Sequence, residues 1–320
     1  MIVVLDGLAA NPGDISWAPL EKYGEVKAYD VTPADSLLER AAGCEMVITN
    51  KTPFDSETIE KLPDLKYIGV LATGFNVVDI DACRKRGIAV TNVPEYGTYA
   101  TAQMTIALLL EIADRVGLHS ESVMNGEWVT APQFSYFKAP LIELAGKRLH
   151  IVGFGKIGRR VAAIASALGM KVSASPHKLV IPEEKVEGYT IKMLSLEEGL
   201  AQADVVTLHC PLTPETNALI NDERISVMKN GAILLNCSRG PVIDEKAVRK
   251  ALDSGKLSGF GADVVSVEPM LPDNPLLGAP NAFITPHIAW APVETRIRLI
   301  QAAADNIGAY LKGERLNRVD

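Results

Sequence analysis

The sequence predicts an α/β protein with two domains, each built on a mostly parallel sheet. Short apolar runs alternate with amphipathic stretches along the whole chain, which is typical of parallel α/β structure. At 320 residues the chain is too long for one typical hydrophobic core. A second series of expected strands and helices begins near residue 148, where an apolar run is followed by a glycine-rich turn.

The first series runs from the N-terminus to about residue 98. Its expected strands are residues 2–5, 26–29, 46–49, 67–71 and 88–92. Helices are expected between several of these strands, at residues 36–42, 56–62 and 79–86. A long apolar helix should then follow at 102–119.

Residues 120–146 contain two Pro, two Phe, a Trp and a Tyr, which is too aromatic for a disordered linker. We interpret this segment as an ordered arm that covers a partner subunit, because exposed aromatic surface usually marks an interface.

The second series has expected strands at residues 148–152, 171–174, 205–209, 232–236, 261–264 and 282–285. A final helix is expected at 293–311. The two series form either tandem domains or a discontinuous pair in which the last helix returns to the first domain.

Bulk properties exclude several classes of protein. A net charge of −7 argues against nucleic acid as a main partner, because phosphate binding needs a clustered basic surface. The four cysteines form no C-x-x-C pair, so neither a metal site nor a disulfide framework is expected, and reduced thiols fit a cytoplasmic protein. The first residues read as a strand, not a signal peptide, and no apolar run is long enough for a membrane span.

A glycine-rich motif predicts dinucleotide binding. Gly153-Phe154-Gly155-Lys156-Ile157-Gly158 matches G-x-G-x-x-G between an expected strand and an expected helix at 157–168. The first glycine permits a tight turn, the second lets a pyrophosphate approach the backbone, and the third lets the helix pack on the strand. The pyrophosphate would bind at the positive end of that helix.

The end of the second strand leaves NAD and NADP both open. NAD-binding proteins usually carry an acidic residue there, but this chain has Ser175, Pro176, His177 and Lys178. A carboxylate would repel a 2′-phosphate, whereas Ser175, His177 and Lys178 would attract it. The cofactor is therefore NAD or NADP, with NADP favoured; an ordinary polar turn that binds NAD is the alternative.

Four further segments resemble the D-2-hydroxyacid dehydrogenase family, in its glycerate dehydrogenase/hydroxypyruvate reductase branch. They are Asn236-Cys-Ser-Arg-Gly240, Ala262-Asp-Val264 leading to Glu268-Pro269, Asp273-Asn-Pro-Leu-Leu277, and Thr285-Pro-His-Ile-Ala-Trp-Ala291. The resemblance covers essentially the whole chain. It implies two Rossmann-like or flavodoxin-like domains with a cleft between them. The substrate domain would comprise residues 1–98 and 292–320, and the dinucleotide-binding domain 99–291.

The resemblance also implies the catalytic residues Arg239, Glu268 and His287. A guanidinium such as that of Arg239 can grip the planar carboxylate of a 2-oxo acid in fork geometry. Hydride delivery to the ketone creates an alkoxide that must be protonated, and a histidine such as His287 suits that role. Glu268 would hydrogen-bond the imidazole, orient it and favour the imidazolium.

By the same resemblance, Ala72, Thr73 and Gly74 would offer backbone N–H groups to the substrate carboxylate, with Lys51 nearby. Asp263 would hold the nicotinamide carboxamide, and the other positions lining the cofactor would be Cys210, Pro211, Thr216, Cys237 and Ser238. Cys237 stands where the family often has Thr, so no reactive nucleophile is implied.

The expected activity is NAD(P)-dependent interconversion of a small D-2-hydroxy acid and its 2-oxo acid. The favoured pairs are hydroxypyruvate/D-glycerate and glyoxylate/glycolate, with D-lactate, formate or phosphite dehydrogenase as alternatives. A non-enzymatic corepressor that senses the dinucleotide is the alternative from another class. Homodimerisation is implied by the family alone.

Overall fold

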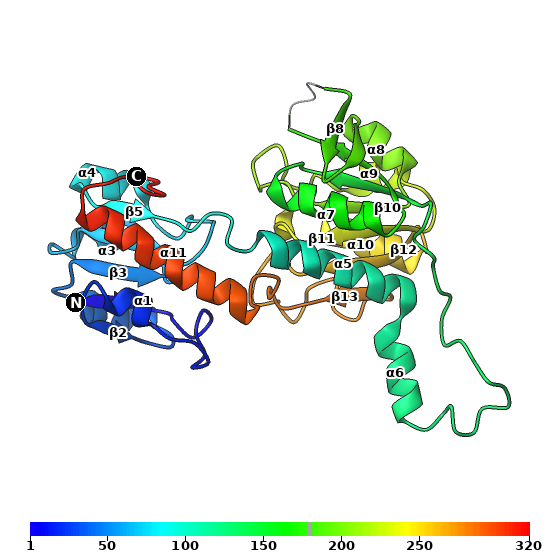
Figure 1. Cartoon of the computed structure of the whole chain (residues 1–320), viewed down its shortest axis with the longest axis horizontal. Coiled ribbons are helices and arrows are strands. Elements are labelled where there is room, and N and C mark those ends of the chain that lie inside the picture. The colour runs from blue at the N-terminus through cyan, green and yellow to red at the C-terminus, as the bar shows by residue number, and fades with distance from the viewer. Residues whose placement is uncertain (178–180) are drawn as a thin grey trace. The chain divides into compact units, whose positions relative to one another are not determined.

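The chain forms two compact units, each centred on its own sheet (Figure 1). The computed structural model describes residues 1–177 and 181–320. Unit 1 comprises Met1–Gly97 and Trp290–Asp320, and unit 2 comprises Thr98–Ala289. The predicted α/β fold with two largely parallel sheets is confirmed.

Unit 1 contains a five-stranded sheet in which every strand pairing is parallel. Its order is β2-β1-β3-β4-β5, the flavodoxin-like order in which ligands bind beyond the carboxyl ends of the strands. The strands are β1 (Ile2–Val4), β2 (Val26–Ala28), β3 (Met46–Thr49), β4 (Tyr67–Val70) and β5 (Ala89–Thr91).

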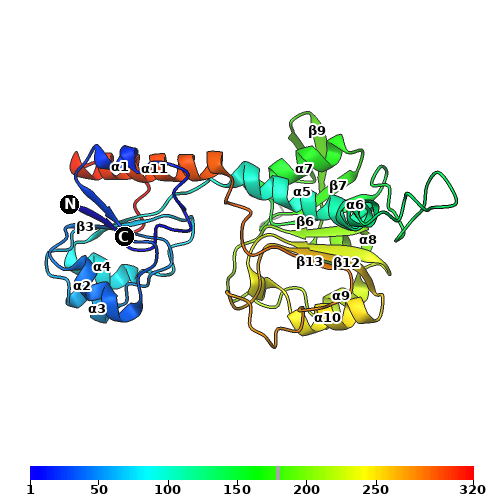
Figure 2. The same ribbon diagram turned by 90° about the horizontal axis from the view of Figure 1, so that it is seen from below.

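Helices cover both faces of this sheet (Figure 2). One face carries α1 (Ala18–Glu21) and α11 (Val293–Leu311), and the other carries α2 (Leu37–Ala41), α3 (Ser56–Glu60) and α4 (Ile80–Arg86). The sequence sets several ends: Asp55 and Asp79 cap α3 and α4, and Gly87 ends α4 in the left-handed conformation. A short 3-10 turn, η1 (Ala34–Ser36), precedes α2.

Unit 2 contains an eight-stranded sheet of order β13-β12-β11-β10-β6-β7-β9-β8. The strands from β9 to β12 follow the 3-2-1-4-5-6 order of a dinucleotide-binding fold, with the reversal between β6 and β10. Its strands are β6 (Arg148–Val152), β7 (Lys171–Ser175), β8 (Glu183–Val186), β9 (Tyr189–Met193), β10 (Val205–Leu208), β11 (Ala232–Asn236), β12 (Leu257–Ala262) and β13 (Ala282–Ile284).

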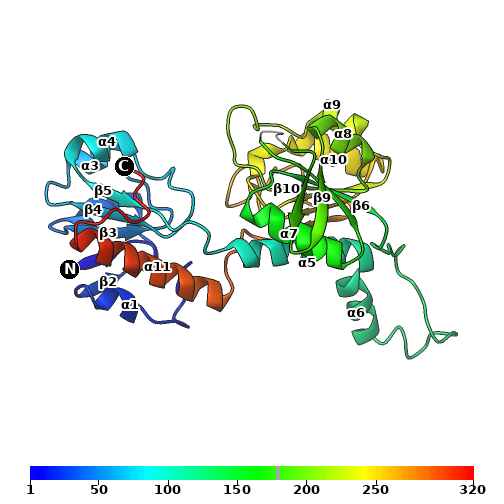
Figure 3. The same ribbon diagram turned by 45° about the horizontal axis from the view of Figure 1, so that its top comes forward.

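The helices of unit 2 also lie on both faces of its sheet (Figures 2 and 3). On one face α5 (Thr98–Asp114) packs beside α7 (Lys156–Ala167). The other face carries α8 (Leu196–Gln202), α9 (Asp222–Val227) and α10 (Glu245–Asp253). Ser195, Asn221 and Asp244 cap these three helices through their side chains. The 3-10 turn η2 (Gly240–Val242) follows β11.

The predicted single helix at 102–119 is wrong, because the chain turns at Arg115. Helix α5 ends at Asp114, and α6 (Val116–Met124) begins in a new direction after Arg115, which has a φ of +53°. The guanidinium of Arg115 lies 4.8 Å from the Phe283 ring, and its Nη2 donates to Asn281. These are contacts between distant residues, so helical periodicity could not reveal the break.

Two strand predictions also need correction. The strand expected at 261–264 lies at Leu257–Ala262, and the hairpin of β8 and β9 was not predicted. Gly259 and Gly261 weaken the sequence signal of β12, yet a Cβ at these positions would approach Ile112 and Leu235 to 2.5 and 2.8 Å. Strand β8 pairs antiparallel with β9, so the sheet of unit 2 is mixed at this edge.

Within residues 1–177 and 181–320, no helix is long and apolar enough to cross a membrane.

Candidate functional site

The three glycines of the G-x-G-x-x-G motif have three different environments. Gly153 has a φ of +91°, and a Cβ there would lie 2.6 Å from the backbone nitrogen of Cys210. A Cβ at Gly158 would lie 2.5 Å from the Gly153 carbonyl oxygen. At Gly155, in contrast, a Cβ would meet no described atom within 4 Å. The first and third glycines therefore allow close packing, and the second leaves open space above the loop.

That open space lies at the N-terminus of α7. Gly155 is the N-cap residue and makes no side-chain cap, so no cap side chain stands between a ligand and the start of the helix. Phe154 is buried and Ile157 packs against the same core, so these two would contribute their backbone, while the Lys156 side chain is exposed. Helix α7 follows β6, next to the point where the strand order reverses. The loop thus fits a dinucleotide pyrophosphate.

Arg159 braces this loop, a role that the sequence motif does not predict. Its Nε and Nη2 donate to the two carboxylate oxygens of Glu184 at 2.8 and 2.9 Å. Its guanidinium lies 4.7 Å from the Phe154 ring and donates to the Phe154 carbonyl. The hairpin of β8 and β9 is thereby tied to the glycine loop.

At the end of β7, Ser175 points into the unit. Its hydroxyl donates to the Leu194 carbonyl at 2.9 Å and lies 2.9 Å from His150 Nε2. The hydroxyl is therefore already engaged within the unit, and the Ser175 carbonyl accepts the Gly153 N–H at 3.0 Å. His177 is exposed, and Lys178, the third residue expected here, lies outside the described residues.

His150 is a buried polar group below this strand end. Its imidazole is fully buried on β6, and its Nδ1 lies 3.0 Å from the Ser173 hydroxyl. Burial lowers the pKa of His150 to about 4, so the ring is neutral at physiological pH. His150 therefore belongs to the core of unit 2.

The loops after β10 and β11 hold the remaining expected cofactor positions. Burial raises the pKa of Cys210, and raises that of Cys237 to about 12, so both thiols remain protonated. The Thr216 hydroxyl donates to the Pro211 carbonyl at 2.6 Å and fixes that turn. The Ser238 hydroxyl donates to Asn236 Oδ1 at 2.8 Å.

Glu268 and His287, 19 residues apart in sequence, meet directly. His287 Nδ1 lies 2.6 Å from Glu268 Oε2, and the two side chains are 31% and 34% exposed. The second carboxylate oxygen of Glu268 accepts the Val265 N–H at 3.2 Å. Because Nδ1 is engaged by the carboxylate, Nε2 is the nitrogen left to face a substrate. A partly exposed imidazole oriented by a carboxylate can transfer a proton.

Asp263 holds the turn on which His287 sits. His287 has a φ of +54°, a conformation that few non-glycine residues adopt. The carboxylate of Asp263 is 1% exposed and accepts the Thr285 hydroxyl at 2.6 Å, the Ile288 N–H at 2.9 Å and the Ala289 N–H at 2.7 Å. These donors flank His287 on both sides. The sequence suggested a carboxamide contact for Asp263 and gave no sign of this second task.

Arg239 follows the end of β11, and its loop contacts the loop of Glu268. The Arg239 side chain is exposed, and its Nη1 donates to the Ser238 carbonyl at 2.8 Å. A Cβ on the next residue, Gly240, would lie 2.0 Å from the Val265 carbonyl carbon. Only glycine permits this crossing, which sets the Arg239 loop against the Glu268 loop. Arg239, Glu268 and His287 thus follow three adjacent strands of one sheet.

In unit 1, Lys51 and Ala72–Gly74 follow adjacent strands, β3 and β4. Lys51 is exposed, and its loop is held by the Asp6 carboxylate, which accepts the backbone N–H groups of Asn50, Lys51 and Thr52. The carbonyls of Ala72 and Thr73 accept hydrogen bonds from residues after β5. Among the described residues, none accepts a hydrogen bond from the backbone N–H of Thr73 or Gly74. Asp6 was not anticipated, since a lone aspartate after a strand has no distinctive pattern.

No group of three or more His, Cys, Asp or Glu side chains within residues 1–177 and 181–320 is arranged to hold a metal ion.

Comparison with known proteins shows which family this chain resembles. Residues 106–289 match the family described as "D-isomer specific 2-hydroxyacid dehydrogenase, NAD binding domain". A hydroxypyruvate reductase from Blautia hydrogenotrophica is 47% identical over 100% of this chain and 99% of its own. A glycerate dehydrogenase from Methylorubrum extorquens is 38% identical over 92% of both chains. Among solved structures, a protein from Thermus thermophilus is 39% identical, with a TM-score of 0.86 over the full length of both chains.

Proposed function

Because the chain belongs to the D-isomer specific 2-hydroxyacid dehydrogenase family, we propose that it reduces hydroxypyruvate to D-glycerate, or glyoxylate to glycolate, with a reduced nicotinamide cofactor. The chain is thus a dehydrogenase of 2-hydroxy acids with an NAD-binding domain. The observation that carries the proposal is the 2.6 Å contact between His287 Nδ1 and Glu268 Oε2. Relatives named for hydroxypyruvate and glycerate support this substrate pair.

The residues of unit 2 divide the chemistry among them. Arg239 binds the substrate carboxylate through its guanidinium, which matches the planar carboxylate in fork geometry. His287 donates the proton on Nε2 to the substrate ketone oxygen, and Glu268 orients the imidazole through its contact with Nδ1. A bound reduced nicotinamide supplies the hydride to the ketone carbon. The reduction then consumes one hydride and one proton for each hydroxyl formed.

The two units have different tasks in this proposal. Unit 1 is the substrate domain, where Lys51 and the N–H groups of Ala72, Thr73 and Gly74 bind the substrate carboxylate. Unit 2 is the dinucleotide-binding domain. Its proposed cofactor contacts are Gly153, Phe154, Gly155, Lys156, Ile157, Gly158, Ser175, His177, Lys178, Cys210, Pro211, Thr216, Cys237, Ser238 and Asp263.

Steady-state kinetics over a panel of 2-oxo acids test this function. We expect oxidation of the reduced cofactor with hydroxypyruvate and glyoxylate, and kcat/KM at least tenfold lower with pyruvate. Formate and phosphite should support no reduction of the oxidised cofactor. Turnover of pyruvate above that of hydroxypyruvate and glyoxylate would contradict the substrate proposal.

NADP is proposed as an accepted cofactor in addition to NAD. No carboxylate occurs among Ser175, Pro176 and His177, and an exposed His177 can attract a 2′-phosphate. Binding of NADH and NADPH, followed by fluorescence, should give dissociation constants within tenfold of each other. The variant His177→Asp places a carboxylate there and should weaken NADPH alone by about tenfold. Wild-type NADH binding more than tenfold tighter than NADPH contradicts the proposal.

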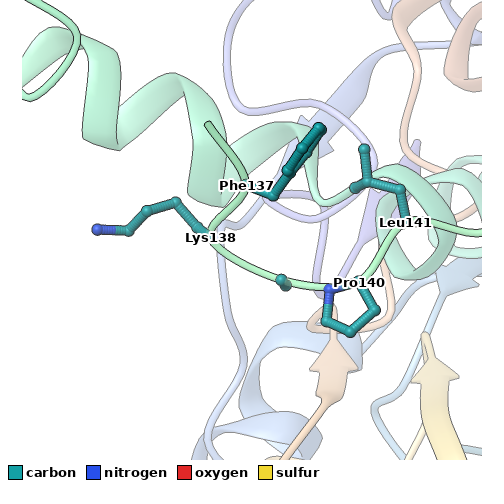
Figure 4. Close-up of a pocket in the computed structure, with 5 residues that line it drawn as sticks. Phe137, Lys138, Pro140 and Leu141 are labelled. Atoms are coloured by element: carbon teal, nitrogen blue, oxygen red, sulfur yellow. The ribbon is translucent and has the colours of Figure 1, made fainter. Parts of the chain in front are cut away.

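A homodimer that assembles through the arm, residues 120–146, is part of the same proposal. Several large apolar side chains of the arm are mostly exposed in the single chain, namely Met124, Val129, Phe134 and Phe137. Phe137, Pro140 and Leu141 also line a shallow pocket on the arm (Figure 4). Sedimentation of the wild type should report a dimer, and Phe134→Ser with Phe137→Ser should shift it toward monomer. A wild-type monomer at micromolar concentration contradicts this assembly.

We also place the enzyme in the cytoplasm. All four cysteines are free and buried, as expected where thiols are kept reduced.

A further inference from the structure

Two asparagines flank the loop that follows β4. Asn50 comes directly after β3 and Asn92 directly after β5, and these strands lie on either side of β4. Asn50 Nδ2 donates to the Leu71 carbonyl at 2.6 Å, and Asn92 Nδ2 donates to the Thr73 carbonyl at 2.7 Å. Both donors are side-chain amides, and both acceptors are backbone carbonyls of the same short loop.

Residues 92 and 93 hold the loop after β4 through three hydrogen bonds. Besides the bond to Thr73, the Val93 N–H donates to the Ala72 carbonyl at 3.0 Å. The Thr73 hydroxyl donates to the Val93 carbonyl at 3.0 Å. Two consecutive carbonyls, those of Ala72 and Thr73, are therefore turned toward residues 92–93.

This arrangement decides where the next N–H groups point. In a planar trans peptide the N–H of one residue is antiparallel to the carbonyl of the residue before it. Since the Ala72 and Thr73 carbonyls face residues 92–93, the Thr73 and Gly74 N–H groups point the opposite way. Two neighbouring N–H groups on one side of a loop form a notch that suits one carboxylate.

Asn92 is itself held by a buried relay of amides. Asn306 on α11 is 1% exposed, and its Nδ2 donates to the Asn92 carbonyl at 2.9 Å. Asn317 donates through Nδ2 to Asn306 Oδ1 at 2.9 Å, and its carbonyl accepts the Asn92 N–H at 3.2 Å. A buried amide in an apolar helix face is costly unless it is hydrogen-bonded, and here both the oxygen and the nitrogen of the Asn306 side-chain amide have partners.

We propose that Asn92, backed by Asn306, is a positioning residue that turns the Gly74 N–H toward the substrate carboxylate, beside the Thr73 N–H whose direction the Val93 backbone sets. This inference rests on the proposed function for the assignment of the carboxylate to this loop. In this proposal the side-chain amides of Asn92 and Asn306 set the affinity of unit 1 for the substrate without contacting the substrate.

The test compares Asn92→Ala and Asn306→Ala with the wild type. Without the Asn92 amide the Thr73 carbonyl loses its hydrogen bond and the direction of the Gly74 N–H is no longer fixed, so KM for hydroxypyruvate should rise about tenfold with a smaller change in kcat. Asn306→Ala should raise KM in the same direction, by about threefold. The dissociation constant for NADH should stay within twofold of wild type, because the glycine loop is unchanged.

The control variant is Asn221→Ala. Asn221 caps α9 through Oδ1, so its loss also removes a side-chain amide that stabilises the backbone. It should leave KM unchanged. A KM rise in Asn221→Ala equal to that in Asn92→Ala would mean a general effect of destabilisation, and would overturn the proposal. An unchanged KM in Asn92→Ala would overturn it as well.

Two measurements without turnover separate this inference from the proposed function. Exchange of the Val93 amide hydrogen should be faster in Asn92→Ala than in wild type, and titration of the wild type with oxamate should shift the Thr73 and Gly74 amide resonances. If no 2-oxo acid is reduced but both effects appear, the proposed function fails and the notch stands. If oxamate shifts neither amide, the inference is wrong. Asn306→Ala serves in place of Asn92→Ala if that variant does not fold.

Discussion

The glycine loop of unit 2 and the loop after β4 in unit 1 are both proposed to bind an anion through backbone N–H groups, but they are built differently. The glycine loop relies on missing side chains: Gly153 and Gly158 allow packing that any Cβ would block. The loop after β4 relies on added side chains, because Asn92 fixes the Thr73 carbonyl from outside. One loop is shaped by its own residues and the other by its neighbours.

This difference explains why one loop is recognisable in sequence and the other is not. Glycines that are needed for local conformation recur at fixed spacing, so a short motif reveals them. Asn92 and Asn306 are 214 residues apart and meet only in the folded unit. A sequence motif therefore reveals the glycine loop but not the relay of Asn92, Asn306 and Asn317.

The largest expected effect is on NADH binding, and it distinguishes Gly155 from Gly153 in the glycine loop. Gly155→Ala should keep the melting temperature within about 2 °C of wild type, because its Cβ enters open space. The same Cβ would occupy the place of the pyrophosphate, so NADH should bind at least about 100-fold more weakly. Gly153→Ala meets both a positive φ and the Cys210 backbone, and should lower the melting temperature of unit 2 markedly. Calorimetry and fluorescence titration check both; equal melting temperatures for the two variants would contradict this assignment.

The second prediction is that the stabilities of the two units depend differently on pH. All five histidines lie in unit 2, and burial lowers the pKa values of His150 and His209 to about 4. The unfolded chain binds these protons near pH 6.5 but the folded chain does not, so stability is lost as pH falls from about 6.5 to about 4. His150 alone should account for about 3 kcal/mol over that range.

Denaturant unfolding at several pH values, read by amide exchange, measures this loss in each unit. The variant His150→Asn should show a shallower decline of unit 2 stability between pH 6.5 and 4 than the wild type. Unit 1 has no histidine, so its stability, obtained from exchange rates after correction for the intrinsic pH dependence of amide exchange, should change less in the same window. An unchanged slope in His150→Asn would show that the ring is protonated in the folded state.

The smallest expected effect concerns the other held loop of unit 1. The Asp6 carboxylate accepts three consecutive N–H groups, from Asn50 to Thr52, and thereby places Lys51. Asp6→Asn keeps the size but replaces one acceptor oxygen by a donor, so at least one N–H loses its partner. We expect about threefold higher KM for hydroxypyruvate and a loss of about 1–2 kcal/mol in the free energy of unfolding. A KM equal to that of wild type would contradict the idea that Asp6 positions Lys51 for substrate binding.

Much of the fold follows from sequence periodicity, because parallel strands are short apolar runs. The bounds of β3 and β11, and of helix α11, were predicted to the residue. The errors have tertiary causes. The helix break at Arg115 depends on Phe283 and Asn281, and the glycines of β12 are there for close packing against Ile112 and Leu235.

For the site, sequence supplied the residue types but not their support. The resemblance to the family implied that Glu268 and His287 form a pair, and the structure brings them into contact. The Asp263 carboxylate that brackets His287, and the crossing at Gly240, are contacts between separate loops. No rule of sequence spacing predicts such contacts, so only the folded structure reveals them.

The central claim is that His287 supplies the proton when the ketone is reduced, and single-turnover reduction of hydroxypyruvate by His287→Ala tests it most directly. The account predicts a loss of at least about 100-fold in the reduction rate, with the dissociation constant for NADH within about threefold of wild type. His119→Gln, which alters a histidine of α6, should retain the wild-type rate. Reduction by His287→Ala at a rate within about threefold of wild type would contradict the account.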